Sequence, residues 1–314
     1  MKANYQPPLA WTGRIDGNEE EVSRWHQKIK CVDLRQALPS GKGVVLLGFA
    51  VDEGVRRNKG RAGAAEGPAA LRQAMGSFPL HFDGMLMDGG NIICIDQDLE
   101  AAQQALSEAV QVIKRAGHTP LLLGGGHEIT YGHAHGLYQS LPGKRLGLIN
   151  FDAHFDLRQE GVSSGTGFWQ LAQAHSPFQY LALGIQQLSN TQQLFSIAGE
   201  LDALYIEADA FHFQDRTVLL AALAAFIREA DKLYLTIDLD VFAAAYAPGV
   251  SATAFNGIRP DGLFLECFRT ILQSGKLAGM DIAELNPSFD IDQRTAKLGA
   301  AFIFEAVAYL LSGK

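Results

Sequence analysis

The sequence predicts an α/β protein: a three-layer α/β/α sandwich in which helices cover both faces of a central, mainly parallel sheet. Short, continuously apolar segments alternate along the chain with longer segments of helical character. Such alternation is typical of right-handed βαβ crossovers. The apolar segments also lack the strict polar–apolar alternation of a strand with one solvated face, which indicates strands buried on both sides.

Six apolar segments are the predicted strands: residues 43–49, 119–123, 146–151, 180–184, 233–237 and 277–280. The clearest predicted helix begins after Asp98, a residue type that caps helix starts, and ends at Gly117, because glycine commonly follows the last helical turn. A second predicted helix spans 216–230. No linker, low-complexity tract or repeat interrupts the pattern, so we expect a single domain over residues 1–314. Residues 1–42 would be a polar N-terminal extension packed on it.

The composition limits the possible partners and locations. With 47% apolar and 19% charged residues the chain is globular, and a net charge of −8 argues against non-specific binding to nucleic acid. The longest apolar run, 218–227, has ten residues, whereas a membrane span needs roughly 18 or more. Residues 1–21 are polar, so we expect no signal peptide. Cys31, Cys94 and Cys267 are odd in number and far apart, which favours reduced thiols and a cytoplasmic location.

Polar residues follow four of the predicted strands directly. The segments are GGGHE (124–128), DAHFDLR (152–158), DLDVF (238–242) and DIAELNP (281–287). In open parallel sheets ligands bind beyond the carboxyl ends of the strands. Burying so many carboxylates there without strong positive charge would be prohibitive, and a divalent metal ion is the natural counter-ion.

Of these segments, DAHFD (152–156) is the one that most strongly indicates a metal site. Asp152, His154 and Asp156 are spaced two apart, so an extended backbone points all three to one side. Asp238 and Asp240 repeat this spacing. A single Asp-x-Asp pair is more often a solvated loop, and a lone histidine after glycines more often begins a helix, but the combination is what metal coordination requires.

The number of candidate ligands indicates which metal is bound. Two imidazoles and four carboxylates are too many for one tetrahedral ion and suit two ions that share bridging carboxylates. An oxygen-rich set without a thiolate favours Mn²⁺ over a structural zinc site. The predicted metal ligands are His127, Asp152, His154, Asp156, Asp238 and Asp240.

These four segments, in this order, resemble the arginase/ureohydrolase family, and the resemblance extends back to residues 54–72. Three details resemble the family members that hydrolyse N-formimidoyl-L-glutamate to L-glutamate and formamide in histidine degradation: Gly126, Arg158 and the loop SSGTGF (163–168). Arginases themselves carry aspartate in place of Gly126. They also carry a proton-shuttling histidine where this chain has Phe168.

The resemblance implies an arginase-like sandwich with an eight-stranded parallel sheet and two Mn²⁺ ions per subunit. It also makes a homo-oligomer plausible. The carboxylate of Glu284 would face the amidine group of the substrate. The implied metal roles are His127 and Asp156 on one ion, His154 and Asp240 on the other, and Asp152 and Asp238 on both.

In the implied reaction a metal-bridging hydroxide attacks the amidine carbon. We expect Glu284 to pair with the formimidoyl cation and Asp156 to pass a proton to the leaving amine. The substrate is small and acidic, so its two carboxylates need cations, and Arg158 is the first candidate because a guanidinium binds carboxylates with two parallel hydrogen bonds. The loop 56–61 has four cationic side chains in six residues. It either supplies further positive charge to the substrate carboxylates or is a solvated turn. The predicted substrate-binding residues are Arg158, Glu284, Asn58, Arg61, Ser164 and Thr166.

Two alternatives keep the predicted metal site. Another ureohydrolase, an agmatinase or a guanidino-acid hydrolase, would share every metal ligand and differ only in the substrate pocket. A non-catalytic metal-binding homologue is the second alternative, but no member of the ligand set is degraded. A dinucleotide-binding oxidoreductase is excluded because no G-x-G-x-x-G motif follows the first predicted strand.

Overall fold

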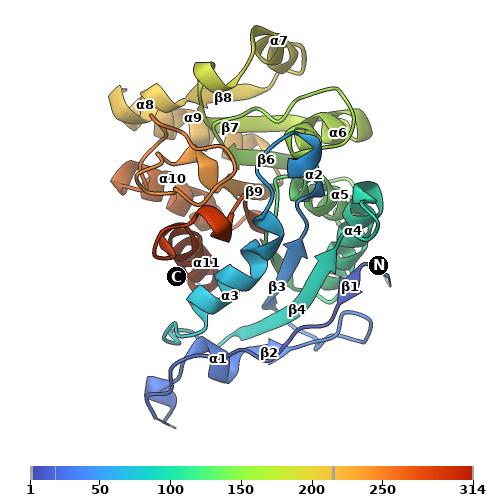
Figure 1. Ribbon diagram of the computed structural model, residues 1–314, viewed down its shortest axis with the longest axis vertical. Helices are drawn as coiled ribbons and strands as arrows, with labels where there is room; N and C mark the ends of the chain where they lie inside the picture. The colour runs from blue at the N-terminus through green and yellow to red at the C-terminus, as the bar shows by residue number, and fades with distance from the viewer. Residues whose placement is uncertain (1–2, 18, 214–215, 313–314) are drawn as a thin grey trace.

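In the computed structural model, which describes residues 3–17, 19–213 and 216–312, ten strands pair into one sheet in the order β1-β4-β3-β5-β10-β9-β6-β7-β8, with β2 paired to β4 (Figure 1). All pairs are parallel except that of β1 with β4. The strands are β1 (Tyr5–Gln6), β2 (Lys30–Cys31), β3 (Gly43–Ala50), β4 (Met85–Ile93), β5 (Thr119–Leu123), β6 (Leu146–Phe151), β7 (Gln179–Ile185), β8 (Leu204–Glu207), β9 (Lys232–Asp238) and β10 (Leu277–Ala283).

The α/β class and all six predicted strands are confirmed, as β3, β5, β6, β7, β9 and β10. The sequence prediction missed β4 and β8, and also the two-residue strands β1 and β2. Strand β4 contains Asp88, Gly89, Gly90 and Asn91, residue types that are depleted in strands. Strand β8 is a short edge strand with exposed Leu204 and Tyr205, so it has no continuous buried apolar run. With these two strands the sheet has the eight parallel strands that the resemblance implies, and β1 and β2 extend one edge.

Helices cover both faces of the sheet, because alternate residues of each strand point to opposite sides and each side needs apolar cover. One layer contains α1 (Trp25–Lys28), α3 (Gly67–Met75), α8 (Ala208–Phe213), α9 (Arg216–Glu229), α10 (Gly262–Gln273) and α11 (Arg294–Ser312). The other contains α4 (Leu99–Arg115), α5 (Ile129–Ser140), α6 (Gly167–Ala174) and α7 (Gln192–Glu200). Figure 1 shows α3 and α11 on one side of the sheet and α4 and α5 on the other.

The two predicted helices are confirmed as α4 and α9. The Asp98 carboxylate accepts a hydrogen bond from the Ala101 N–H (2.9 Å), as expected of an N-cap. Such a cap stabilises a helix by about 1 kcal/mol. Gly117 has a φ of +87°, the left-handed conformation that ends α4.

One described helix, α11, is long and apolar enough to cross a membrane by length and composition alone. Its buried residues form one stripe, and the helix packs against α3, α10 and β3. A stripe of this kind is typical of a helix that covers a sheet. The buried residues are Thr295, Ala296, Gly299, Ala300, Phe302, Ile303, Ala306 and Val307.

A buried ion pair ties the N-terminal segment to the sheet. Asp88 on β4 is fully buried and accepts two hydrogen bonds from Arg72 of α3, at 2.8 and 3.0 Å. The Trp11 indole N–H donates to the same carboxylate (2.7 Å). Arg72 also donates to Asn91 Oδ1 (2.8 Å) and to the Gly90 carbonyl (2.7 Å). This network satisfies the polar stretch of β4 that interrupts its apolar pattern.

We expect Arg72→Met to lower the free energy of unfolding by about 3–5 kcal/mol, because the Asp88 carboxylate would stay buried without its cation. Urea-induced unfolding followed by circular dichroism measures this loss. The matched control is Arg115→Met, at an exposed arginine in the last turn of α4, which should change stability by less than about 0.5 kcal/mol. Equal effects of the two variants would contradict the assignment.

Candidate metal centre

The four polar segments meet because the strands that precede them are neighbours in the sheet. Strands β5, β10, β9 and β6 lie side by side in that order, although the chain visits them in the order β5, β6, β9, β10. All four run parallel, so their carboxyl ends lie at the same edge of the sheet. That edge therefore collects His127, Glu284, Asp238 and the segment 152–156.

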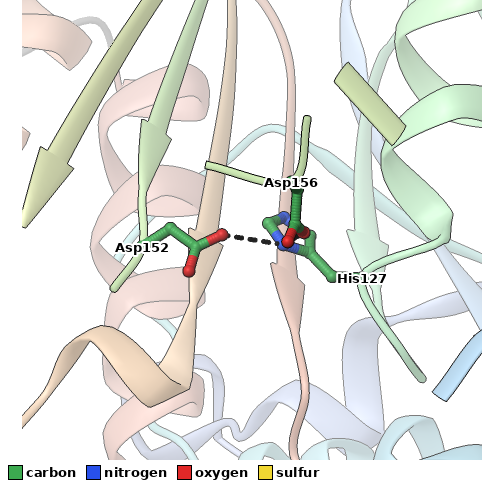
Figure 2. A group of neighbouring side chains, drawn as sticks. All are labelled: His127, Asp152 and Asp156. Carbon is green, nitrogen blue, oxygen red and sulfur yellow. Dashed lines mark ion pairs between the residues drawn. The ribbon is translucent and has the colours of Figure 1, made fainter. Parts of the chain in front are cut away.

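One group of side chains surrounds the imidazole of His127. Its Nδ1 atom lies 2.9 Å from Asp156 Oδ2, 3.1 Å from Asp152 Oδ2 and 3.2 Å from Asp238 Oδ2. Figure 2 shows the Asp152 carboxylate directed at this ring, with Asp156 overlapping the ring in the view. One N–H cannot satisfy three acceptors, and Nδ1 is in fact a buried atom without a hydrogen-bond partner. Ligands of a single ion, bound at about 2.1 Å, lie about 3 Å apart, so these spacings suit coordination.

A second group forms around His154 and shares Asp152 with the first. His154 Nδ1 lies 3.3 Å from Asp152 Oδ1 and 3.3 Å from Asp240 Oδ2. The two oxygens of Asp152 thus face different imidazoles, which is the arrangement of a bridging carboxylate. Asp238 turns one oxygen toward His127, and its other oxygen accepts the Asp240 N–H (2.8 Å).

Among the residues that the structure describes, no lysine or arginine balances the negative charge of the cluster. Asp152, Asp238 and Asp240 are at most 4% exposed, and within the described ranges no lysine or arginine forms an ion pair with them. Burial raises the pKa of Asp240 well above the usual range of a carboxyl group and that of Asp156 to about 6. Burial also opposes charge on Asp152, but the two neighbouring imidazoles keep its pKa below the usual value. The six groups therefore fit divalent metal ions, whose charge would hold every carboxylate ionised.

Glu284 adds a fifth carboxylate at the edge of the cluster. Its Oε1 accepts the His127 N–H (2.8 Å), and its own N–H donates to the Gly125 carbonyl (2.8 Å). Burial, with Asp238 nearby, raises the pKa of Glu284. Its φ is +65°, and that of Asp156 is +51°, a left-handed conformation that is uncommon for non-glycine residues. Glu284 lines the cavity described below, so its carboxylate can contact a bound molecule.

A cavity of about 200 Å³ opens over the cluster. On the side away from the strand ends it is lined by Asn58, Arg158 and Ser164, and the Asn58 amide donates to Ser164 Oγ (3.1 Å). Gly165 leaves space for the Arg158 side chain, because a Cβ at position 165 would lie 3.0 Å from Arg158 Cδ. Arg158 is exposed, and no carboxylate of the described chain forms an ion pair with it. It also lines a wider outer cavity of about 680 Å³.

Two predicted substrate-binding residues, Arg61 and Thr166, do not line the inner cavity. The guanidinium of Arg61 donates to the carbonyls of Val250 (2.6 Å) and Ser251 (2.8 Å). Thr166 is fully buried, and its hydroxyl donates to the Ser163 carbonyl (3.0 Å) and accepts the Ser163 N–H. Both side chains are therefore engaged in holding loops that border the site.

Two of the four cations in the loop 56–61 form ion pairs with carboxylates of the protein. Arg56 and Arg57 are the last two residues of α2 (Glu53–Arg57), and both form ion pairs with Glu53. Arg57 pairs with Glu100 as well (2.9 Å). Their charges are thus not available to a ligand in the inner cavity.

Sequence reasoning missed two residues that hold the site from within the strands. Thr236 Oγ1 lies 3.0 Å from His127 Nε2, and the Asn150 amide donates to Asp152 Oδ2 (3.0 Å). Each precedes a cluster aspartate by two positions: Thr236 precedes Asp238 on β9, and Asn150 on β6 precedes Asp152, which follows the end of that strand. A period of two places such pairs on one face, so this signal was present in the sequence.

The departures from the arginase pattern have a structural explanation. A Cβ on Gly126 would lie 2.1 Å from Glu128 Oε2, so the buried Glu128 carboxyl occupies the space that a side chain at position 126 would need. Its other oxygen accepts the Gly54 N–H (2.7 Å). Phe168 is fully buried and its ring stacks on Tyr180 (4.1 Å between centroids), which is a packing role that involves no proton transfer.

Three comparisons bear on this site. The model of the arginase family matches residues 42–309. The chain is 46% identical to a formimidoylglutamase of Rhodococcus opacus over 309 residues, which are 96% of this chain and 95% of that protein. Its fold is similar to that of Bacillus subtilis formimidoylglutamase, with a TM-score of 0.83, 22% identity and 96% of both chains covered. It is also similar to a variant of Trypanosoma cruzi formiminoglutamase solved with Mn²⁺, with a TM-score of 0.75, 26% identity, and 86% of this chain and 93% of that chain covered.

If the cluster binds divalent cations, treatment with a chelator should lower the melting temperature, and Mn²⁺, the ion predicted from the ligand set, should restore it. A ligand at about 100 times its dissociation constant stabilises a protein by about 2.7 kcal/mol, which corresponds to roughly 5 °C for a chain of this length. Differential scanning fluorimetry measures the shift. Asp152→Asn should abolish most of it, whereas Asp209→Asn, at an exposed position on α8, should leave it unchanged. A full shift in the Asp152 variant would refute the shared-ligand arrangement.

Proposed function

The chain belongs to the arginase family, and we propose that it hydrolyses N-formimidoyl-L-glutamate to L-glutamate and formamide. One observation supports this substrate most directly. Buried carboxylates of the cluster and Glu284 line the same cavity as the exposed guanidinium of Arg158, which also borders the wider outer cavity. An amidinium group would be attracted to the buried carboxylates, and the carboxylates of the same molecule to Arg158. A substrate that is cationic at both ends would have no use for Arg158.

We assign the metal ligands of the proposed enzyme as two sets that share bridging carboxylates. Bound Mn²⁺ ions would supply water with a pKa low enough to act as a nucleophile at neutral pH. The assignment places His127 and Asp156 on one ion, His154 and Asp240 on the other, and Asp152 and Asp238 on both.

The remaining roles belong to residues that contact the substrate. In the proposed reaction Glu284 accepts hydrogen bonds from the amidinium nitrogens and holds the amidine carbon over the cluster. Asp156 receives a proton from the attacking water and passes it to the nitrogen of the leaving glutamate. The bond between the amidine carbon and that nitrogen then breaks, and the water oxygen stays with formamide.

The rim of the cavity sets the specificity in this proposal. Arg158 would bind a substrate carboxylate through two parallel hydrogen bonds, and Asn58 and Ser164 would bind it through their amide and hydroxyl groups. Arg61 and Thr166 would act only indirectly, by fixing the loops around the site.

We further propose that the whole chain acts as one catalytic domain and works in the cytoplasm. Strands β1 and β2 of the N-terminal segment pair with β4 of the main sheet. Cys31, Cys94 and Cys267 are all unpaired, which suits a reducing compartment.

The decisive experiment is an assay of the Mn²⁺-reconstituted protein with N-formimidoyl-L-glutamate, agmatine, arginine and 4-guanidinobutyrate in parallel. We expect glutamate release from the first compound and little or no product from the others. Selective turnover of a guanidine would replace this proposal with another ureohydrolase activity. Bound metal without turnover of any of the four would favour a non-catalytic homologue.

Arg158→Ala should raise the KM for N-formimidoyl-L-glutamate by about 10- to 100-fold, because hydrogen bonds to charged groups contribute about 1.5–3 kcal/mol. Metal content, measured by atomic emission, should stay at the wild-type level. Arg158→Lys keeps the charge but loses the planar geometry, so its KM should be intermediate. An unchanged KM in Arg158→Ala would remove this residue from the substrate site.

A further inference from the structure

The segment that carries three of the assigned metal ligands is irregular backbone beyond the end of β6. Asp152, His154 and Asp156 lie on residues 152–156, and the chain there is neither strand nor helix. Asp156 has a φ of +51°. Unfavourable conformations of this kind persist only when the surrounding structure holds them in place. Some part of the protein must therefore hold this loop.

Asn190 contacts the loop with its whole side-chain amide. Its Nδ2 donates to the Ala153 carbonyl (2.8 Å), and its Oδ1 accepts the Phe155 N–H (3.0 Å). These two backbone groups flank His154 on either side. The second hydrogen on Nδ2 bonds to the Gln186 carbonyl (2.8 Å), so every hydrogen of the amide is used and the orientation of the group is fixed.

The position of Asn190 makes these contacts effective. It lies between β7 and α7, is only 7% exposed, and shares the Ala153 carbonyl with the Gln186 N–H (3.1 Å). The Tyr180 hydroxyl also donates to the Phe155 carbonyl (3.0 Å). The backbone around His154 therefore cannot shift away from the cluster without breaking buried hydrogen bonds, which is costly.

We propose that Asn190 is a positioning residue for the metal centre, which clamps the backbone around His154 and thereby holds the His154 and Asp156 side chains in their coordinating positions. The proposal rests on the metal-ligand assignment of the proposed function. It does not depend on which substrate the enzyme takes. Partners that orient metal ligands commonly change metal affinity by 10- to 100-fold when they are removed.

The test compares Asn190→Ala with two other variants. Asn190→Asp has nearly the same shape and keeps an acceptor for the Phe155 N–H, but it places a second oxygen against the Ala153 and Gln186 carbonyls. The matched control is Asn4→Ala, at a buried asparagine that donates to the Ile93 carbonyl (3.0 Å) on the far side of the sheet. Mn²⁺ affinity is measured by titration under electron paramagnetic resonance, without substrate, and stability by thermal unfolding of the metal-free proteins.

We expect Asn190→Ala and Asn190→Asp to raise the dissociation constant for Mn²⁺ by about 10- to 100-fold, whereas Asn4→Ala loses stability but keeps the wild-type constant. Wild-type Mn²⁺ affinity in a folded Asn190→Asp or Asn190→Ala protein would overturn the proposal. A loss of affinity in Asn4→Ala as large as in the Asn190 variants would overturn it too, because the effect would then be one of general destabilisation. If neither Asn190 variant folds while Asn4→Ala does, the residue supports the fold and the proposal is wrong.

The same measurements separate this inference from the proposed function. Wild-type protein that binds Mn²⁺ but does not turn over N-formimidoyl-L-glutamate contradicts the proposed reaction, while the affinities of the variants still decide the role of Asn190. Wild-type protein that binds no Mn²⁺ contradicts both the metal assignment and the clamp.

Discussion

Electrostatic repulsion among buried carboxylates is the constraint on which the rest of this structure depends. Asp152, Asp156, Asp238, Asp240 and Glu284 meet at the middle of the sheet edge, and among the described residues no lysine or arginine pairs with them. Protein groups alone leave several of them with raised pKa values. Divalent cations resolve the conflict, and the same cations would supply the chemistry of an amidine hydrolase.

The order of the strands in the sheet brings these carboxylates together. Because β10 and β9 lie between β5 and β6, four polar turns that are distant in the chain become neighbours. The backbone around them is held by groups with no chemical role, such as the Thr236 hydroxyl on His127 and the Asn190 amide on the loop after β6. Asp156 and Glu284 both have left-handed φ values, so the surrounding structure must hold their backbone in a conformation that is unfavourable for residues other than glycine.

Charges of both signs line the cavity. The negative cluster and the exposed Arg158 line the same inner cavity, and Arg158 also borders a wider outer one. Of the arginines in the neighbouring loop, Arg56 and Arg57 pair with Glu53 and Arg57 also with Glu100, whereas Arg61 donates to backbone carbonyls. One unpaired guanidinium opposite an acidic cluster is an arrangement that selects a molecule with an amidinium at one end and a carboxylate at the other.

The sequence by itself determined the α/β class, six of the main strands and the kind of chemistry, because buried strands need continuous apolar runs and aspartate and histidine residues directly follow them. The extended backbone expected for residues 152–156 was wrong: the chain there is irregular and Asp156 has a φ of +51°, so packing, and not a period of two, brings these side chains together. Strands β4 and β8 escaped this reasoning, since the polar groups of β4 are satisfied by Arg72 from another element and β8 lies at an edge. Only the tertiary structure decided that Asp152 faces both imidazoles, that the Arg61 and Thr166 side chains are engaged outside the cavity, and that Asn190 holds the ligand loop. Such contacts join segments far apart in the chain, and their geometry depends on how the strands and loops pack, which no local pattern records.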